Sequence, residues 1–470
     1  MPMVSRVRTT QDVSKFDAII VGAGQAGPPL AGRLTAAGMT VALVERKLVG
    51  GTCVNTGCMP TKTLIASARA MHLARRGPEF GVLAGRVRFD MKIAAGRASE
   101  VSRNARESSE ASLRSMDRLT FLRGHARLTG PSSVMVGNRV LSAPKIFLNV
   151  GGRASMPNMP GIADVPYLDN TDMVALQRVP EHLVVVGGSY VGLEFAQMQR
   201  RFGAEVTVVE RNDRLVSRED RDISEAIRSA LEGEGIQVRT SADCIGLKRH
   251  GAGVAVSVDC FSGPPVVAGS HVLIAVGRRP NTDDLGLETA NVETDEKGFI
   301  RVDDQLRTTA EGIWALGECN GQGAFTHTAY NDFEIVAANL LDGENRTLAM
   351  RVPGYALYTD PPLGRAGMTE EEARAAGHEL IVSVRPMSRV GRAVENGETI
   401  GLMKLVADSK TRKILGAAIF GIGGDEAIHG ILDLMSVGHS VEALRWAVPI
   451  HPTVSELLPT LASEVQGRAV

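Results

Sequence analysis

The clearest pattern along the chain is a short apolar run, a glycine-rich turn, a helical stretch and a second apolar run. Residues 16–21 form the first run, and residues 41–45 form the second, which ends in Glu45. A helix is predicted between them, up to Gly38. Short apolar runs in this order are typical of buried parallel strands, so the segment predicts one complete strand–helix–strand unit of a dinucleotide-binding fold.

The same order recurs later in the chain. Residues 183–186 are predicted as a strand, 193–202 as a helix and 205–210 as a second strand that again ends in an acid, Glu210. From about Pro353 onward, predicted strands and amphipathic helices alternate without a glycine fingerprint. The sequence therefore predicts an α/β protein with two Rossmann-like dinucleotide-binding domains and an α+β domain at the C-terminus.

Two further segments, 149–153 and 275–281, are predicted as crossovers that carry the chain between these domains. The stretch 62–118 is charged and favours helix. The predicted limits are a flexible tail over 1–16, a first dinucleotide-binding domain over 17–152 and 283–350, a second over 153–282, and a C-terminal domain over 351–470.

Composition narrows the class of protein. The 470 residues are 44% hydrophobic and 22% charged with a net charge of −1, which predicts a large core and argues against nucleic-acid or membrane partners. No apolar run is long enough to span a bilayer, and the polar N-terminal residues lack the apolar segment of a signal peptide. Five cysteines are sparse and odd in number for a secreted disulfide framework, so we expect a cytoplasmic protein.

The first glycine-rich turn matches the fingerprint of a dinucleotide site. Gly22 is expected to form the tight turn, Gly24 to let the backbone approach a pyrophosphate, and Gly27 to let helix and strand pack closely. Glu45 is expected to accept a hydrogen bond from a ribose hydroxyl. A glycine turn alone is weak evidence, but with the strand, the helix and the acid in place it predicts nucleotide binding.

The second turn has Gly187 and Gly192, but Ser189 stands at the middle position. A serine Cβ narrows the approach to a phosphate, so a turn that serves packing alone is the alternative to a second nucleotide site. Glu210 favours the 2′-hydroxyl of NAD over a 2′-phosphate. Because Arg211 follows directly and favours the opposite, we predict NADH and keep NADPH as the alternative.

Cys53 and Cys58 lie in a glycine-rich loop that is predicted to run into a helix near Gly57. Two thiols close to a nucleotide site predict electron transfer through a disulfide; two structural thiols or half a metal site are the alternatives. No second Cys/His cluster has zinc spacing, so no metal site is predicted. The helix N-terminus favours a thiolate on Cys58, and Lys62, one turn further on, is placed to face a flavin ring. The remaining cysteines are interpreted as core residues: Cys244, Cys260 and Cys319.

Near the C-terminus, His451 stands five residues before Glu456. Such a pair is usually part of the protein surface and nothing more. Beside a redox dithiol it predicts acid–base catalysis, because a leaving thiol needs a proton donor and imidazole titrates in the right range. A carboxylate behind the ring would fix its tautomer.

The segments 50–62 (GGTCVNTGCMPTK) and 451–456 (HPTVSE), together with the two fingerprints, resemble the class I pyridine nucleotide–disulfide oxidoreductases. This family includes glutathione reductase, dihydrolipoamide dehydrogenase and mercuric reductase, and the resemblance covers nearly the whole chain. Within the family, the sequence is similar to mercuric-reductase-like proteins and to the bacterial reactive-chlorine-resistance flavoproteins. Residues 461–470 lack the cysteine pair that genuine mercuric reductases carry there.

The resemblance implies a homodimer that uses FAD and NAD(P)H. Cys58 resembles the thiol next to the flavin, and Cys53 resembles the thiol that meets the substrate. Lys62 resembles the lysine near flavin N5, with Glu194 as its ion-pair partner. His451 and the glutamate of HPTVSE resemble the acid–base pair, which in this family reaches the dithiol of the other subunit.

The resemblance also implies which residues contact each cofactor. For FAD they are Gly22, Gly24, Gly27, Glu45, Gly51, Thr52, Lys62, Ala126, Gly317, Glu318 and Thr326. For NAD(P)H they are Gly187, Tyr190, Gly192, Glu194, Glu210 and Gly277. In this family the tyrosine covers the nicotinamide pocket. At Glu318 the family has Asp, so this chain departs from the pattern by one methylene group.

We therefore predict that electrons pass from NAD(P)H through the flavin and the Cys53–Cys58 disulfide to a small-molecule or protein disulfide, or in reverse from a dithiol to NAD. A reductase of a metal ion, a quinone or a reactive chlorine species is the second prediction. A redox-sensing flavoprotein with little turnover is the third, from another class. The intact HPTVSE segment favours thiol chemistry, because a bare electron donor needs no acid for a leaving group.

Overall fold

The computed structural model describes residues 13–259 and 263–464, and its contacts divide the chain into two compact units. Each unit is assembled from three segments that are far apart in the sequence. The first consists of Met1–Pro60, Ser99–Arg153 and Arg278–Ala349, and the second of Thr61–Ala98, Ala154–Gly277 and Met350–Val470. Two of the five changes of unit fall at or beside the predicted crossovers, which carry the paired strands β9 (Gly152–Ala154) and β17 (Arg278–Pro280). The predicted domain limits stay a prediction.

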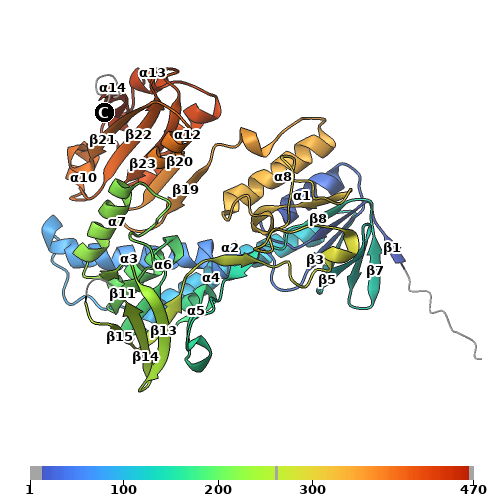
Figure 1. The fold of residues 1–470 in the computed structure, drawn as a ribbon, viewed down its shortest axis with the longest axis horizontal. Helices are drawn as coiled ribbons and strands as arrows, with labels where there is room; N and C mark the ends of the chain where they lie inside the picture. The colour runs from blue at the N-terminus through green and yellow to red at the C-terminus, as the bar shows by residue number, and fades with distance from the viewer. Residues whose placement is uncertain (1–12, 260–262, 465–470) are drawn as a thin grey trace, which may run out of the picture. The chain divides into compact units, whose positions relative to one another are not determined.

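A five-stranded parallel sheet forms the centre of the first unit (Figure 1). Across the sheet, the strands are β18 (Ile313–Ala315), β8 (Ile146–Leu148), β2 (Ala18–Val21), β3 (Val41–Glu45) and β4 (Leu119–Arg123). The two strands predicted for the first dinucleotide unit are confirmed as β2 and β3, and both are buried along their whole length. Their unbroken apolar sequences fit the centre of a parallel sheet, where both faces are covered.

Helices α1 (Gly27–Ala36) and α8 (Thr326–Leu341) pack side by side in this unit (Figure 1). Pro28 and Pro29 lie in the first turn of α1, where their missing N–H groups have no intrahelical partner. The short helix α2 (Gly51–Thr56) follows β3. A second sheet has the order β1 (Val13–Lys15), β7 (Arg139–Ser142), β6 (Ser133–Val136) and β5 (Ala126–Gly130).

The second unit contains a four-stranded parallel sheet and a three-stranded antiparallel sheet. The first has the order β12 (Gln237–Arg239), β11 (Glu205–Val209), β10 (His182–Val186) and β16 (His271–Ile274), and the second β13 (Asp243–His250), β14 (Gly253–Asp259) and β15 (Val266–Gly269). Helix α6 (Tyr190–Phe202) connects β10 to β11, and α7 (Arg221–Gly233) connects β11 to β12. The second predicted dinucleotide unit is therefore confirmed, with its helix beginning at Tyr190 rather than at residue 193.

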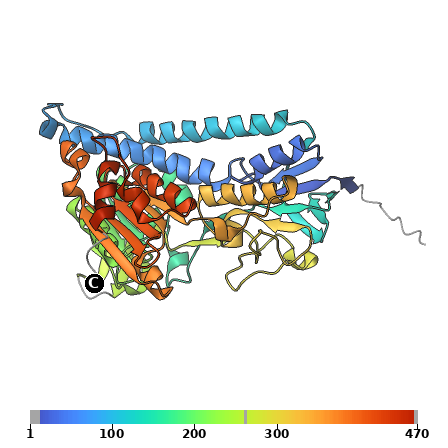
Figure 2. The same cartoon turned by 90° about the horizontal axis from the view of Figure 1, so that it is seen from above.

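The C-terminal part of the second unit is a five-stranded antiparallel sheet, and most of its helices pack on one face (Figure 2). Its strands are β19 (Gly354–Leu357), β20 (Leu363–Gly367), β23 (Ile414–Phe420), β22 (Leu402–Asp408) and β21 (Leu380–Pro386). Its helices are α9 (Glu370–Ala375), α10 (Gly391–Glu395), α11 (Gly424–Ala427), α12 (His429–Ser436), α13 (Val441–Arg445) and α14 (Leu458–Glu464). Phe420 and Leu363 share one buried cluster with Phe195 of α6, so this sheet and the dinucleotide part of the unit have a common core.

The helix-forming stretch predicted over 62–118 consists of two helices, α3 (Cys58–Arg76) and α4 (Met91–Ser115). The small helix α5 (Asn170–Ala175) precedes β10. Among the residues that the structure describes, no helix has both the length and the apolar character needed to cross a membrane.

Candidate active site

The first fingerprint needs glycine at two positions because of the protein's own backbone. Gly22 has a φ of +106°, and a Cβ there would lie 2.2 Å from the carbonyl oxygen of Asn149. A Cβ on Gly27 would lie 2.3 Å from the carbonyl oxygen of Gly22. Both distances are far below van der Waals contact. The tight turn and the close packing of helix on strand that the sequence predicts are therefore present.

Gly24, at the middle of the fingerprint, lies beneath the loop that leads to the cysteines. A Cβ on Gly24 would lie 3.3 Å from Nδ2 of Asn149, and a Cβ on Gly51 would lie 3.1 Å from the Cα of Gly24. The amide of Gly50 donates to the carbonyl oxygen of Ala23 at 2.8 Å, which ties the loop to the turn. The structure thus brings Gly51 to the fingerprint.

Glu45 ends β3 beside the same turn and is only 8% exposed. Its Oε2 accepts from the amide of Ala23 at 2.8 Å, and its Oε1 accepts from the amide of Lys47 at 2.6 Å. The carboxylate is therefore fixed at the strand end where a ribose is bound in folds of this kind. Of the other residues assigned to FAD, Thr52 is exposed, while the methyl group of Ala126 is buried in the core.

Glu318, which stands where the family has Asp, is held by an arginine. Nε of Arg278 lies 2.5 Å from Oε1 of Glu318, and Nη2 lies 2.9 Å from Oε2. The same Nη2 donates to the carbonyl oxygen of Gly152 at 2.8 Å. The longer side chain thus directs its carboxylate toward the crossover strands β9 and β17. The neighbouring Gly317 donates its amide to the buried carboxylate of Asp332 at 2.7 Å.

The two cysteines lie on successive helices. The sequence predicts the helix that begins near Gly57, but it places Cys53 in a loop. Cys53 is within α2, because residues 51–56 form a helix, and Cys58 is the first residue of α3. Cys58 therefore stands at the N-terminus of α3, where backbone amides and the positive end of the helix dipole lie. Cys58 is exposed, and its Sγ lies 3.5 Å from Oγ1 of Thr326, another residue assigned to FAD.

Cys319 is confirmed as a core residue. It is fully buried, and burial raises the pKa of its thiol to about 12. Its Sγ lies 3.3 Å from the carbonyl oxygen of Leu316. At neutral pH this group stays a thiol and is a poor nucleophile. The same prediction for Cys260 lies outside the described residues, as does the side chain of Cys244.

Lys62, on the first turns of α3, forms an ion pair with Glu194 of α6. Nζ lies 2.7 Å from Oε2, and the Glu194 side chain is only 5% exposed. The second carboxylate oxygen accepts from the amide of Tyr358 at 3.1 Å. The Lys62 ammonium also lies over the Tyr358 ring, 4.5 Å from its centroid. The structure therefore contains the ion pair that the resemblance implies.

The second fingerprint repeats the steric pattern of the first. Gly187 has a φ of +115°, and a Cβ there would lie 2.4 Å from the carbonyl oxygen of Ala275. A Cβ on Gly192 would lie 2.1 Å from the carbonyl oxygen of Gly187. Ser189, at the middle position, is exposed and caps α6 with extended backbone angles (φ −107°, ψ −178°). Serine therefore fits the turn without strain, and Tyr190 follows as the first residue of α6.

Glu210 stands after β11 as Glu45 stands at the end of β3. Its Oε2 accepts from the amide of Gly188 at 2.6 Å, and its Oε1 accepts from the amide and the side chain of Asn212, at 2.8 and 2.6 Å. Gly277 has a φ of +130°, and apart from its chain neighbours no atom of the described residues lies within 4 Å of where its Cβ would be. The backbone is therefore open to a ligand at this point.

His451 and Glu456 are in contact, as the sequence predicts. Nδ1 of the ring lies 2.7 Å from Oε2 of the carboxylate, and the amide of Thr453 donates to the same oxygen at 3.4 Å. Because a carboxylate accepts, Nδ1 carries the hydrogen and Nε2 is left for a reacting group. The imidazole is 81% exposed, while Glu456 is 12% exposed. The arrangement presents an oriented imidazole at the surface of the C-terminal part.

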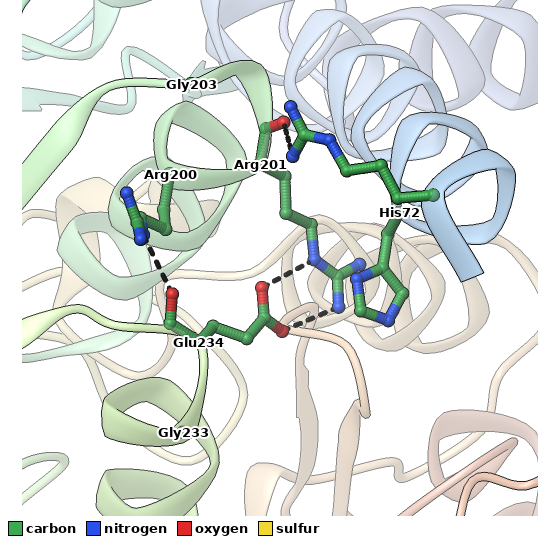
Figure 3. Close-up of a pocket in the computed structure, with 7 residues that line it drawn as sticks. His72, Arg200, Arg201, Gly203, Gly233 and Glu234 are labelled. Atoms are coloured by element: carbon green, nitrogen blue, oxygen red, sulfur yellow. Dashed lines mark hydrogen bonds and ion pairs between the residues drawn. The ribbon is translucent and has the colours of Figure 1, made fainter. Parts of the chain in front are cut away.

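A hollow of about 360 Å³ lies at the ends of α3, α6 and α7 (Figure 3). None of the predicted site residues lines it. Arg201 pairs with Glu234 at 2.7 and 2.9 Å, Arg200 donates to the carbonyl oxygen of Glu234 at 2.8 Å, and Arg75 donates to that of Arg201 at 2.8 Å. Burial, and then the charge of Arg201, lowers the pKa of His72. Two of these bonds are accepted by carbonyl oxygens near the C-termini of α6 and α7, so the hollow is a feature of how these helices end.

Two residues that contribute to the site carry no motif. Asn149 donates from Nδ2 to the carbonyl oxygen of Gly22 at 3.3 Å and lies against all three glycines of the first fingerprint. The sequence marks it only as part of a crossover. Its place at the carboxyl end of a parallel strand is the signal that points to a ligand. Tyr358 follows an antiparallel strand, and nothing in the sequence links it to Lys62.

Both fingerprints fit a dinucleotide. Each has a glycine turn that leads into the N-terminus of a helix, where backbone amides face a pyrophosphate, and a fixed carboxylate after the next strand, where a ribose is bound. Where a side chain replaces the middle glycine, it is a small one, Ser189. The first fingerprint also lies in the same unit as the two cysteines.

Comparison with known proteins shows which family has these features. Residues 16–332 match the family model described as pyridine nucleotide-disulphide oxidoreductase, and residues 353–462 match the model of its dimerisation domain. The probable pyridine nucleotide-disulfide oxidoreductase RclA of Escherichia coli (strain K12) is 35% identical over 97% of this chain and 100% of its own length. Mercuric reductase of Bacillus cereus is 32% identical over 94% of this chain and 70% of its own length.

A solved structure of the same Escherichia coli protein supports the match. It is described as the Cu(II) complex of the HOCl-induced flavoprotein disulfide reductase RclA, and it aligns with a TM-score of 0.87 at 35% identity. The alignment covers 96% of this chain and 100% of that chain. The predicted fold class, enzyme class and cofactors are thereby confirmed. The chain belongs to the pyridine nucleotide-disulphide oxidoreductase family and is an enzyme that uses FAD and NAD(P)H.

Proposed function

We propose that Cys53 and Cys58 form the redox disulfide of this enzyme and that they reduce a disulfide in a small molecule or a protein. FAD held at the first fingerprint would supply the two-electron transfer between NAD(P)H and this disulfide. The observation that carries the proposal is the position of Cys58 at the N-terminus of α3, 3.5 Å from Thr326. The helix end stabilises the Cys58 thiolate, so Cys53 is the thiol that attacks the acceptor.

The enzyme acts as a homodimer in which His451 of one subunit serves the cysteines of the other. The family's dimerisation domain supports this arrangement. So do three exposed apolar side chains close to the histidine in sequence, Trp446, Val448 and Ile450, which are 74%, 95% and 79% exposed. Apolar groups exposed in this way mark a contact surface. Nε2 of the imidazole then takes the proton of the attacking Cys53 thiol and gives it to the leaving thiolate, while Glu456 holds the ring.

The other predicted site residues take their roles from the two fingerprints. Those of the first unit bind FAD, and those around Gly187 and Glu210 bind the nicotinamide coenzyme. We assign NADH as the preferred coenzyme, because the fixed carboxylate of Glu210 favours a 2′-hydroxyl and repels a 2′-phosphate. The sparse, odd set of five cysteines supports a reducing compartment, the cytoplasm.

A second candidate function is the reduction of a metal ion by the same cysteines. Two observations favour it: one similar protein is a mercuric reductase, and the solved relative is a Cu(II) complex. In this reading the thiolates bind the ion, and the acid–base pair is not required for turnover. The HPTVSE segment, with its formed His451–Glu456 contact, favours the disulfide acceptor instead.

Cys53→Ser and Cys58→Ser variants test the proposal under anaerobic conditions. Both variants are expected to keep FAD and its reduction by NADH, and both are expected to lose turnover with every disulfide in an acceptor panel followed at about 340 nm. Reduced Cys53→Ser keeps a thiolate beside the flavin and its long-wavelength absorbance, whereas reduced Cys58→Ser does not. Identical long-wavelength spectra in the two variants would overturn the assignment of the two thiols.

The His451→Ala variant tests the acid–base pair. It is expected to slow disulfide reduction by about 100-fold or more while NADH still reduces the flavin at nearly the normal rate. Glu456→Gln is expected to cost less, because the imidazole remains. Reduction of a metal ion should be unaffected by either change, because it needs the cysteines but no acid for a leaving group. An equal loss of disulfide and metal-ion reduction would contradict the proposed role of His451 and Glu456.

Mixed dimers test whether the pair acts across the interface. A heterodimer of Cys53→Ser and His451→Ala subunits has one site with both lesions and one site with neither. Activity is therefore expected to reappear when two inactive homodimers are mixed and exchange subunits. No recovery in a preparation shown to contain heterodimers would mean that the histidine serves its own subunit.

A further inference from the structure

The Lys62–Glu194 pair lies at one end of a longer row of polar contacts. On α6, Glu194, Gln197 and Arg201 follow one another at spacings of three and four residues, so they share one face of the helix. On α3, Lys62 and Arg69 are seven residues, or two turns, apart and also share a face. Both faces contact the same segment of chain, residues 358–360 between β19 and β20.

Asp360 anchors this segment to both helices. Its Oδ1 lies 2.5 Å from Nη1 of Arg69, and its Oδ2 lies 2.5 Å from Nη1 of Arg201. Its amide donates to Gln197 Oε1 at 2.7 Å, and its carbonyl oxygen accepts from Gln197 Nε2 at 2.7 Å. Arg201 is in turn held by Glu234 (Figure 3). With a further bond from Arg201 Nη2 to the carbonyl oxygen of Asp360 at 3.3 Å, five bonds fix the position of this one residue relative to α3 and α6.

The charges around Asp360 favour the ionised form of its carboxyl group. Burial alone would raise the pKa of the Asp360 carboxyl, but the two guanidinium groups outweigh burial and the pKa is lowered. Asp360 is 13% exposed and Arg201 is 5% exposed, so solvent screens the pair little. Breaking such a pair is costly, because it leaves an uncompensated buried charge. The contacts of Asp360 with the two arginines therefore stay formed.

Tyr358, two residues before the anchor, completes the surroundings of the ion pair. Its amide occupies the Glu194 oxygen that Lys62 does not use, at 3.1 Å. Its ring lies under the Lys62 ammonium, 4.5 Å from centroid to Nζ. A cation is attracted to the face of an aromatic ring at this distance. Lysine and glutamate are therefore each held by two contacts, and Tyr358 supplies one to each.

We infer that Tyr358 is a positioning residue that holds the Lys62–Glu194 pair in a single geometry, and that Asp360 holds Tyr358. The inference rests on the proposed place of Lys62 beside the flavin. A fixed cation there stabilises the negative charge that the flavin gains on reduction, and a cation on a long flexible side chain does so less well when its position is not fixed. Tyr358 acts through Lys62 and does not itself touch the reacting atoms.

The test is the ratio of reduced to oxidised flavin in the FAD-loaded enzyme, at equilibrium with a redox dye at one fixed potential. We expect Lys62→Met to lower this ratio by about 10-fold or more, because the charge is lost. Tyr358→Leu is expected to lower it by roughly 3- to 10-fold, the range of a partly exposed cation–π contact. Tyr358→Phe retains the ring and is expected to restore the ratio to within about twofold of the unmodified enzyme.

Two comparisons make the test specific. Tyr167→Leu is the same substitution at a half-exposed tyrosine elsewhere in the second unit, and the ratio is expected not to change. The KM for NADH is also expected to stay the same in Tyr358→Leu, while the rate of flavin reduction at saturation falls. If the leucine variant does not fold, Tyr358→Met fills most of the same space without an aromatic face, and the same decrease is expected.

The outcomes separate this inference from the proposed function. If Lys62→Met lowers the ratio while both Tyr358→Leu and Tyr358→Phe behave like the unmodified enzyme, the positioning role is wrong and the place of Lys62 stands. If Lys62→Met leaves the ratio unchanged, the proposed place of Lys62 is wrong, and the role of Tyr358 falls with it. A decrease in Tyr358→Phe equal to that in Tyr358→Leu assigns the effect to the hydroxyl and overturns the argument from the ring.

Discussion

The two glycine-rich fingerprint turns make the same contacts with the strands and acids around them. The first glycine of each would place a Cβ 2.2 Å (Gly22) or 2.4 Å (Gly187) from a carbonyl oxygen after a neighbouring strand. The last glycine of each would place one 2.3 or 2.1 Å from the carbonyl oxygen of the first. In each, an acid after the next strand accepts from the amide that follows the first glycine, at 2.8 Å for Glu45 and 2.6 Å for Glu210.

The turns differ at the middle position and in what lies over it. Gly24 is covered by the loop of Gly50 and Gly51, which is bonded to the turn, whereas Ser189 is exposed. The covered turn of the first fingerprint suits a cofactor that stays bound, such as FAD. The open turn of the second fingerprint suits a coenzyme that enters and leaves in each cycle. The outer glycines are thus set by the protein's own packing, and the middle residue by the ligand.

The largest effects are expected from Gly22→Ala and Gly187→Ala. Each substitution places a methyl group against a carbonyl oxygen, at a residue whose positive φ disfavours any side chain. Strain and overpacking together are expected to lower the free energy of unfolding by about 2–5 kcal/mol. The first variant is expected to lose FAD, and the second to keep FAD but lose reduction by NADH. Flavin absorbance of the purified protein and stopped-flow reduction measure the two results.

Matched glycines provide the control for this pair. Gly32 in α1 has only Cε of Met116 near its Cβ position, at 3.6 Å, and Gly233 in α7 has no atom within 4 Å. Gly32→Ala and Gly233→Ala are therefore expected to keep both functions. Loss of FAD in Gly187→Ala would break the comparison, because it would show that the two turns do not serve separate ligands.

A smaller effect is expected from Glu210→Arg, which changes the acid of the open turn. The unmodified enzyme is expected to have a higher kcat/KM for NADH than for NADPH, and the variant to move the ratio toward NADPH by roughly 10- to 100-fold. The physical reason is removal of the repulsion between a carboxylate and a 2′-phosphate. Steady-state kinetics with both coenzymes measure the shift. A preference for NADPH in the unmodified enzyme would contradict the assignment and would point to Arg211.

The smallest effects are expected from exchanging the middle residues. Gly24→Ser adds a side chain 3.3 Å from Asn149 Nδ2 under a fixed loop, and is expected to weaken FAD binding by about 10-fold. Ser189→Gly removes a side chain from an exposed turn and is expected to lower the KM for NADH by no more than about threefold. Fluorescence titration of the apoprotein and coenzyme kinetics give the two values. If Gly24→Ser weakened FAD binding by the same factor by which Ser189→Gly lowered the KM for NADH, the loop of Gly50 and Gly51 would not be what distinguishes the two turns.

Much of this site could be predicted because its residues are close in sequence or occupy fixed places in a repeating unit. The fingerprint glycines and Glu45 follow from strand–helix–strand periodicity, and the contact of His451 with Glu456 follows from a spacing of five residues. Lys62 follows from its place one turn after the predicted helix start and from the family resemblance. The prediction of a helix that begins near Gly57 is confirmed by α3, which begins at Cys58. The prediction that Cys53 lies in a loop was wrong, because helix α2 already begins at Gly51. Glycine content indicated a turn, but local propensity does not show where a short helix begins.

The sequence by itself determined the two nucleotide-binding units, the candidate redox cysteines and the contact of His451 with Glu456, because each depends on residue types at short, regular spacings. Only the tertiary structure showed that Asn149 supports all three fingerprint glycines, that Arg278 holds Glu318, and that residues 358–360 join α3 to α6. These contacts link residues more than a hundred positions apart, or side chains whose direction depends on packing. Spacing along the chain carries no record of such contacts, since they are decided by which surfaces the packed helices and strands bring together.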